Sequence, residues 1–131
     1  MSEEKTGKKV LIVDDNPILT DLFKIAFESK GAIVEIENGS KNVIQKVKDT
    51  SPDLILLDLL MPEKDGIEVL KDLKNDEGTK DTRVIILTSS DDNKLKQDAE
   101  NFGAQGYLMK SNMDVSHIAS EVLSSIEKQS T

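Results

Sequence analysis

Five short apolar runs alternate along the chain with longer segments of mixed polarity. The runs are rich in leucine and β-branched residues, and their apolar positions are continuous rather than alternating: Val10–Val13, Ile33–Ile36, Leu54–Leu57, Val84–Leu87 and Tyr107–Met109. Continuous apolar runs are typical of strands that are covered on both faces, as in a parallel sheet. The pattern therefore predicts five buried strands.

The segments between the runs have the period of helices. The last is the clearest, because its apolar residues follow an i, i+3, i+4, i+7 spacing: Val115, Ile118, Ala119, Val122, Leu123 and Ile126. Asn16 before Pro17 is typical of a helix start, and Gly31 and Gly103 are expected to end the first and fourth helices. Alternating strands and helices predict an α/β fold, an open parallel sheet with helices on both faces.

Composition narrows the class of protein. The chain has 131 residues, 17 Lys and Arg against 25 Asp and Glu, a formal net charge of −8 and no cysteine. Without cysteine, disulfides, thiolate catalysis, zinc–thiolate sites and iron–sulfur clusters are excluded. The acidic balance argues against a nucleic-acid surface, which needs basic residues to displace counterions.

The length fits one domain. We expect a mobile N-terminal tail over residues 1–8, one domain over 9–127 and a frayed C-terminus over 128–131. The N-terminus lacks the apolar stretch of a signal peptide, and no apolar run approaches the ~18 residues that cross a bilayer. We therefore expect a cytoplasmic protein that does not enter the membrane.

Side chains able to bind ligands or take part in chemistry follow four of the five predicted strands, whereas the second is followed by Glu37–Asn38–Gly39, which has the pattern of a turn. Asp14 and Asp15 follow the first, Asp58 the third, Thr88 the fourth and Lys110 the fifth. In open parallel sheets, ligands bind outside the carboxyl ends of the strands. We therefore expect three carboxylates, a hydroxyl and an ammonium group to meet at one edge of the sheet.

Asp58 interrupts the otherwise apolar stretch Leu54–Met61, where a purely structural role would favour another apolar residue. A buried carboxylate is costly without a compensating partner, and repulsion from Asp14 and Asp15 should raise at least one carboxyl pKa. A bound divalent cation would relieve both effects. Oxygen ligands without histidine or cysteine nearby favour Mg²⁺.

This set of groups suits phosphoryl chemistry. An ionised Asp58 carboxylate can attack a phosphoryl group and form an acyl phosphate without a general base. The cation and Lys110 would neutralise charge on the phosphoryl oxygens, and Thr88 would donate a hydrogen bond.

Each residue also has an ordinary interpretation when taken alone. Asp14 and Asp15 could cap the first helix, Thr88 could be structural, and Lys110 could be a solvated surface lysine. His117, the only histidine in the sequence, is expected on the exposed side of the last helix. The coincidence of several such groups at strand ends favours function over these alternatives.

Four motifs in this order and spacing resemble one family: Val10–Asn16 (VLIVDDN), Asp58–Pro62 (DLLMP) followed by Asp65–Gly66, Thr88–Ser89, and Gly103–Lys110 (GAQGYLMK). From about Lys9 to Ile126 the chain is similar to the response-regulator receiver domain of two-component signalling. In build it most resembles the free-standing, chemotaxis-type members. The resemblance implies a flavodoxin-like, doubly wound sandwich with strand order 2-1-3-4-5, two helices on one face and three on the other.

The resemblance also implies roles at the strand ends. Asp58 would accept a phosphoryl group from a phosphohistidine on a sensor histidine kinase or a histidine phosphotransfer protein. Asp15 and Asp58, Asp14 largely through water, and the backbone carbonyl of Leu60 would hold Mg²⁺. Lys110 would contact the phosphoryl group.

Further implied roles concern signalling. Thr88 would hydrogen-bond the phosphoryl group on activation, and the side-chain rotamer of Tyr107 would follow Thr88. A downstream protein target would bind the surface formed by 91–102, 106–109 and 113–126. The phosphodonor would dock beside the first helix, where Ile18, Leu19 and Leu22 supply apolar area.

One departure from the family concerns the residue after the lysine. The family usually has proline there, commonly with a cis peptide bond, whereas this chain has Ser111. A non-proline cis bond costs ~3 kcal/mol, so the loop geometry that aims Lys110 is expected to differ.

Two other functions stay open at this point. The chain could be a small Mg²⁺-dependent phosphatase that uses Asp58 as a turnover nucleophile on a diffusible substrate. It could also be an interaction module that works without phosphorylation. We expect a signalling switch that catalyses only its own phosphorylation and dephosphorylation.

Overall fold

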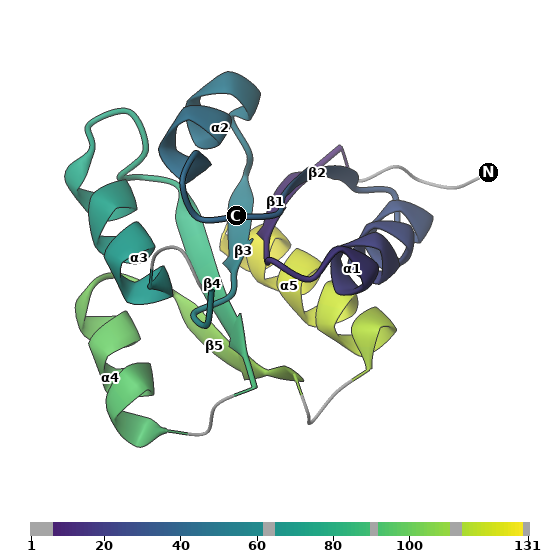
Figure 1. Cartoon of the computed structure of the whole chain (residues 1–131). Helices are drawn as coiled ribbons and strands as arrows, with labels where there is room; N and C mark the ends of the chain where they lie inside the picture. The colour runs from purple at the N-terminus through teal and green to yellow at the C-terminus, as the bar shows by residue number, and fades with distance from the viewer. Residues whose placement is uncertain (1–6, 62–64, 90–91, 111–113, 130–131) are drawn as a thin grey trace.

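The computed structural model describes residues 7–61, 65–89, 92–110 and 114–129. Its five strands form one parallel sheet in the order β2-β1-β3-β4-β5 (Figure 1). The strands are β1 Lys9–Val13, β2 Ile33–Glu37, β3 Leu54–Leu57, β4 Arg83–Thr88 and β5 Gly106–Met109. The helices are α1 Pro17–Ser29, α2 Val43–Thr50, α3 Gly66–Asn75, α4 Asn93–Asn101 and α5 Val115–Gln129. The predicted doubly wound fold and its strand order are confirmed.

Successive residues of the central strands point into two different cores. In β1, Val10 and Ile12 pack with Phe23 and Phe27 of α1 and with the buried stripe of α5. Leu11 and Val13 instead pack against buried residues of α2, α3 and α4. Figure 1 shows α1 and α5 on one side of the sheet and α2, α3 and α4 on the other. Because helices cover both faces of the sheet, successive residues of the strands are apolar and form continuous apolar runs in the sequence.

Local signals define where the helices begin and end. The Asn16 side chain accepts hydrogen bonds from the backbone N–H groups of Ile18 and Leu19, and Pro17 opens α1. Gly31 and Gly103, just beyond α1 and α4, have φ values of 91° and 103°. These left-handed conformations favour glycine, as expected for helix C-terminal caps.

The order of the strands places a crevice at the carboxyl ends of β1 and β3. Strand β1 pairs with β2 on one side and β3 on the other, so the chain winds in opposite directions from it. Such a reversal is where open α/β sheets bind ligands. The loops that carry Asp14, Asp15 and Asp58 leave the sheet at this reversal.

Some predicted features fall outside the described residues. These are Ser111, Pro62, residues 91 and 113 of the predicted target-binding surface, most of the predicted tail over 1–8 and part of the predicted frayed end over 128–131. In the described part of the chain, no helix is long and apolar enough to cross a membrane.

Candidate functional site

Three carboxylates meet at the carboxyl end of the sheet, as predicted. Asp14 and Asp58 directly follow β1 and β3 and are 2% and 4% exposed, whereas Asp15 is exposed. Ligand oxygens of Asp14, Asp15 and Asp58 lie within 4.8 Å of one another. The Asp58 N–H donates to the carbonyl oxygen of Val13 at 2.9 Å. This backbone hydrogen bond holds the loop that begins at Asp58 against the loop that begins at Asp14.

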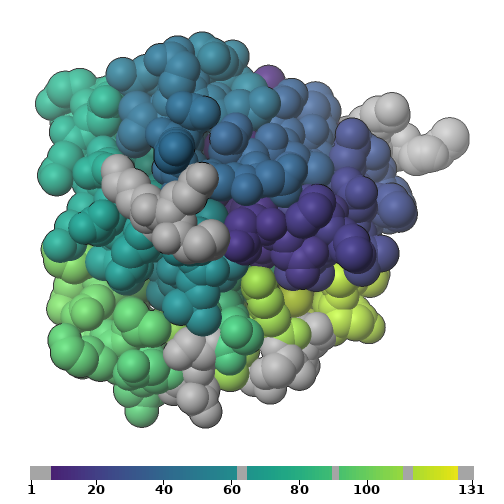
Figure 2. Space-filling model, in the orientation of Figure 1, coloured from purple at the N-terminus to yellow at the C-terminus, as the bar shows by residue number. Residues whose placement is uncertain are grey.

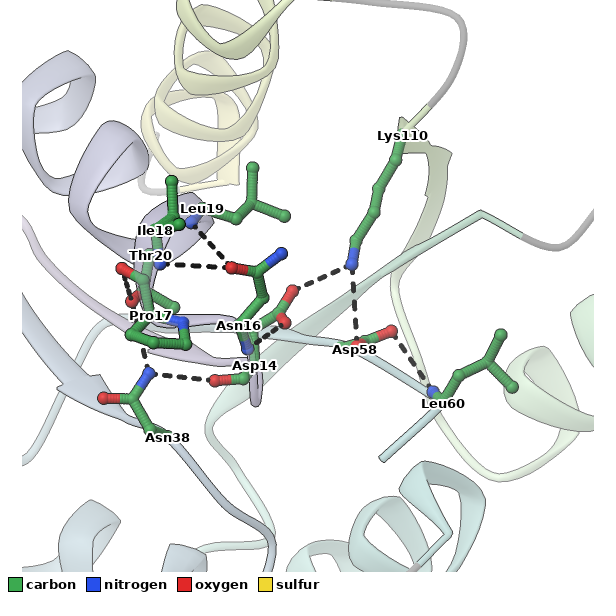
Figure 3. Close-up of polar contacts among 10 residues, drawn as sticks. All are labelled: Asp14, Asn16, Pro17, Ile18, Leu19, Thr20, Asn38, Asp58, Leu60 and Lys110. Atoms are coloured by element: carbon green, nitrogen blue, oxygen red, sulfur yellow. Dashed lines mark hydrogen bonds and ion pairs between the residues drawn. The ribbon is translucent and has the colours of Figure 1, made fainter. Parts of the chain in front are cut away.

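Lys110 approaches this cluster from the end of β5 (Figure 3). Its Nζ lies 2.9 Å from Asp14 Oδ2 and 3.6 Å from Asp58 Oδ2. The ammonium group therefore bridges the two buried carboxylates and is closer to Asp14. Their positions after strands of one parallel sheet predicted that these groups meet, and the structure shows that the Lys110–Asp14 distance is the shorter one.

Burial controls the acidity of Asp58. Desolvation, followed by repulsion from Asp14, raises the pKa of the Asp58 carboxyl to about 6, against an ordinary value of 3.8. The Leu60 N–H donates to Asp58 Oδ1 at 3.2 Å and, with the Lys110 charge, opposes part of this rise. The sequence-based expectation that crowding raises a carboxyl pKa in this cluster holds for Asp58.

The donor set fits Mg²⁺. It consists of carboxylate oxygens close together at a rim that is part buried and part exposed, and no cysteine or histidine lies among them. Hard oxygen ligands of this kind are those that Mg²⁺ prefers, and a cation there would offset the mutual repulsion of Asp14, Asp15 and Asp58.

The structure also gives the positions of Thr88, Tyr107 and Leu60, the other residues predicted for the site. Thr88 ends β4 and is fully buried. Tyr107 is half-buried on β5 and packs against the core beneath α2, α3 and α4. The Leu60 side chain is 54% exposed beside Asp58. The roles of Thr88 and Tyr107, and of the Leu60 carbonyl as a metal ligand, stay predictions.

A groove opens beside the acidic cluster. It has a volume of about 670 Å³ and is lined by Asp15, Leu59, Leu60, Met61, Asp65 and Leu95. Figure 2 looks onto the face where the purple β1–α1 segment lies against the teal segment after β3. Because Asp15 is exposed and lines this groove, the cluster is reachable from solvent on that side.

Asn38 and Thr20 form contacts at the site that were not predicted from the sequence. The Asn38 amide donates to the backbone carbonyl oxygen of Asp14 at 3.1 Å and to Thr20 Oγ1 at 3.2 Å. The segment after the second strand reads as a turn in the sequence. The rule that polar residues after strand ends meet at one edge could have marked Asn38 as it marked Asp58.

The model of the response regulator receiver domain family matches residues 10–122. The chain belongs to this family. Receiver domains act in two-component signalling as aspartyl-phosphorylated switches rather than as enzymes, so this receiver domain is a signalling module.

Known relatives agree with this assignment. The transcriptional regulatory protein YdfI of Bacillus subtilis is 39% identical over 105 residues, which are 78% of this chain and 47% of YdfI. The chemotaxis protein CheY of Bacillus subtilis is 33% identical over 104 residues, 78% of this chain and 84% of CheY. The chain thus spans about half the length of the transcriptional regulators it matches, and most of CheY.

The fold is also that of solved receiver domains. The crystal structure of a CheY-like receiver domain protein from Methanospirillum hungatei superposes with a TM-score of 0.85 at 24% identity, covering 95% of this chain and 98% of that one. At this identity the likeness concerns the fold alone.

Proposed function

We propose that Asp58 of this receiver domain accepts a phosphoryl group from a phosphohistidine on a sensor histidine kinase or a histidine phosphotransfer protein. The observation that carries the proposal is the placement of the buried Asp58 carboxylate between two other carboxylates and the Lys110 ammonium group. A nucleophile, a site for a divalent cation and a fixed positive charge are the groups that phosphoryl transfer requires.

In the proposed step, an oxygen of Asp58 forms the new O–P bond. The P–N bond of the donor breaks, and the imidazole leaves with the electron pair of that bond. Lys110 is placed to neutralise a phosphoryl oxygen, because it already lies 3.6 Å from Asp58 Oδ2. Magnesium, held by Asp14, Asp15, Asp58 and the Leu60 carbonyl, would supply charge neutralisation at the same oxygens.

Phosphorylation would then change the surface that a protein target recognises. The Thr88 hydroxyl would donate a hydrogen bond to the new phosphoryl group. The side-chain rotamer of Tyr107 would change with the position of Thr88, because the two residues lie on the neighbouring strands β5 and β4. The adjoining surface consists of α4, β5 and α5. Binding of a target to one form would shift the equilibrium between the two conformations.

We also propose that this receiver domain works as a free-standing unit of the chemotaxis type. Support comes from the match to 84% and 85% of the length of two CheY proteins, from Bacillus subtilis and Halobacterium salinarum. The size of the native protein, detected by antibody in the source cells, tests this point. A band much larger than the 14.5 kDa of this chain would contradict it.

The phosphorylation proposal is tested by mass spectrometry after incubation with acetyl phosphate and Mg²⁺. Wild type should gain one phosphoryl group, and Asp58→Asn should gain none. Asp53→Asn is the matched control. Asp53 lies just before β3, at the opposite end of the strand from Asp58, so this variant should be labelled as wild type is. Labelling that survives in Asp58→Asn would overturn the assignment, as would steady turnover of small phosphate esters.

A further inference from the structure

The side chain of Asn38 links two loops at the acidic edge of the sheet. Asn38 follows β2, and its Nδ2 donates to the Asp14 carbonyl oxygen at 3.1 Å and to Thr20 Oγ1 at 3.2 Å (Figure 3). Because a carbonyl oxygen only accepts, the end of the amide that faces Asp14 has to be the NH₂ group. Asn38 therefore binds the backbone of Asp14 through its NH₂ group, and its side-chain oxygen does not face Asp14.

With this contact, both backbone groups of Asp14 are held by the end of β2. The Asp14 N–H donates to the carbonyl oxygen of Glu37 at 3.2 Å, which continues the pairing of β1 with β2 by one residue. The Asp14 carbonyl then accepts from Asn38. Since that carbonyl and the N–H of Asp15 belong to one planar peptide unit, fixing one fixes where the backbone of Asp15 begins.

Thr20 fixes the orientation of Asn38 in turn. Thr20 lies on α1, is 1% exposed, and its hydroxyl donates to the Pro17 carbonyl oxygen at 3.0 Å while it accepts from Asn38. The hydroxyl thus has both a donor and an acceptor role satisfied. The chain of contacts runs from the first turn of α1 through Asn38 to the peptide between the two acidic residues.

We propose that Asn38 is a positioning residue of the magnesium site, acting through the backbone of Asp14 and oriented by Thr20. The inference rests on the proposed function, because it assumes that the cluster of Asp14, Asp15 and Asp58 binds the cation. Removing the amide would let the Asp14–Asp15 peptide rotate. The carboxylates would then have to be ordered at the moment of binding, which lowers the affinity.

The direct test is calorimetric titration of Mg²⁺ into the metal-free protein and its variants. Asn38→Ala should raise the Mg²⁺ dissociation constant about tenfold, the lower end of the range for residues that orient metal ligands. Thr20→Val, which keeps the shape and removes the hydroxyl, should raise it less. Thr20→Ser, which keeps the hydroxyl, should leave it unchanged.

A double variant tests whether the two residues form one chain of contacts. If Thr20 acts through Asn38, Thr20→Val should add nothing to the loss of affinity in an Asn38→Ala background. Additive losses would show that Thr20 influences the site by another route and would contradict this part of the proposal. Thr20→Val alone also keeps the proposal testable if Asn38→Ala does not fold.

Thr79→Val is the matched control for a purely structural effect. Thr79 is also 1% exposed, and its hydroxyl donates to the Leu73 carbonyl oxygen at 2.6 Å, between α3 and β4 rather than at the acidic edge. This variant should lose stability and keep the Mg²⁺ affinity of wild type. The proposal predicts in addition that, without metal, Asn38→Ala moves the amide NMR signals of Asp14 and Asp15.

The outcomes separate this inference from the proposed function. Wild type that binds Mg²⁺ and Asn38→Ala that binds it equally well would overturn the positioning role and leave the phosphoacceptor intact. Wild type that binds no Mg²⁺ would overturn the proposed function itself. Equal losses of affinity in Asn38→Ala and Thr79→Val would assign the effect to general destabilisation and reject the inference.

Discussion

Lys110 and Asp14 are 96 residues apart in the sequence and form an ion pair of 2.9 Å between Nζ and Oδ2. The pair joins the ends of β5 and β1, which are separated in the sheet by β3 and β4. Because the Asp14 carboxylate is almost fully buried, this contact supplies charge compensation that water cannot. The Lys110 ammonium group thus offsets part of the negative charge of the acidic cluster.

Replacing Lys110 should therefore affect metal binding and phosphorylation in opposite directions. Lys110→Met removes a positive charge next to Asp14 and Asp58, so Mg²⁺ should bind about fivefold more tightly, as expected for loss of about 1 kcal/mol of repulsion. Phosphorylation by acetyl phosphate should slow by about tenfold or more, because the variant lacks the positive charge that would neutralise the phosphoryl oxygens. Calorimetry and timed mass spectrometry measure the two effects.

Lys80→Met is the control for this experiment, since Lys80 forms an exposed ion pair with Glu77 and should change neither quantity. Weaker Mg²⁺ binding in Lys110→Met would show that the lysine organises the carboxylates rather than competing with the cation.

The raised pKa of Asp58 predicts how stability depends on pH without metal. Its folded value of about 6 exceeds the ordinary 3.8, so protonation favours the folded state. This contribution is complete below pH 3.8 and is lost as the pH rises to about 6. Asp58→Asn should therefore be the more stable protein at pH 7.5 by up to ~3 kcal/mol, and the difference should shrink towards pH 4.

Urea unfolding of both proteins in a chelating buffer at several pH values measures this difference. Adding Mg²⁺ at pH 7.5 should stabilise wild type and have little effect on Asp58→Asn, because a ligand stabilises the state that binds it. A difference between the two proteins that stays constant with pH would contradict the assignment of the raised pKa to Asp58.

Gly66 should be essential to the loop that carries Asp58. A Cβ at this position would lie 2.4 Å from Leu59 Cα and 2.6 Å from the Asp58 carbonyl oxygen, both backbone atoms that cannot yield easily. Gly66→Ala should cost about 2–3 kcal/mol in the free energy of unfolding and slow phosphorylation, because the loop is displaced.

Gly78→Ala is the appropriate comparison for Gly66. Its new Cβ would approach the end of the flexible Lys48 side chain, which can move away, so only a small loss is expected. Denaturant unfolding and acetyl phosphate labelling of the two variants test the contrast. Equal stabilities would show that the α3 start is not closely packed on the loop.

The exposed face of α1 should serve the phosphodonor. Ile18 and Leu22 are 73% and 49% exposed near the acidic edge, whereas Leu19 packs against the core. The predicted docking area is thus reduced to the two exposed residues. Changing both to serine should slow phosphoryl transfer from a phosphohistidine protein by about tenfold and leave labelling by acetyl phosphate unchanged.

Ile33→Thr provides the control for the docking surface. Ile33 is 48% exposed but lies at the start of β2, at the opposite end of the sheet from the acidic cluster. Its replacement should not affect either phosphodonor. Slower labelling by acetyl phosphate in the α1 variant would indicate damage to the site instead of lost docking.

Much of the site could be predicted because parallel strands bring their carboxyl ends together. Once the apolar runs before Asp14, Asp58 and Lys110 are recognised as strands of one parallel sheet, the convergence of these residues follows from topology. The same reasoning missed Asn38, because a polar residue followed by glycine has the pattern of a turn. Its contact depends on which neighbouring loop the side chain reaches.

The chain's pattern by itself determined the strands, the helices and the group of residues at the sheet's edge, because these depend on local period and on chain order. Only the tertiary structure decided that Lys110 lies closer to Asp14 than to Asp58, that Leu19 is packed while Ile18 is exposed, and that burial raises the pKa of Asp58. Each of these depends on distances of a few ångströms and on exclusion of water, and both are set by packing between elements distant in sequence.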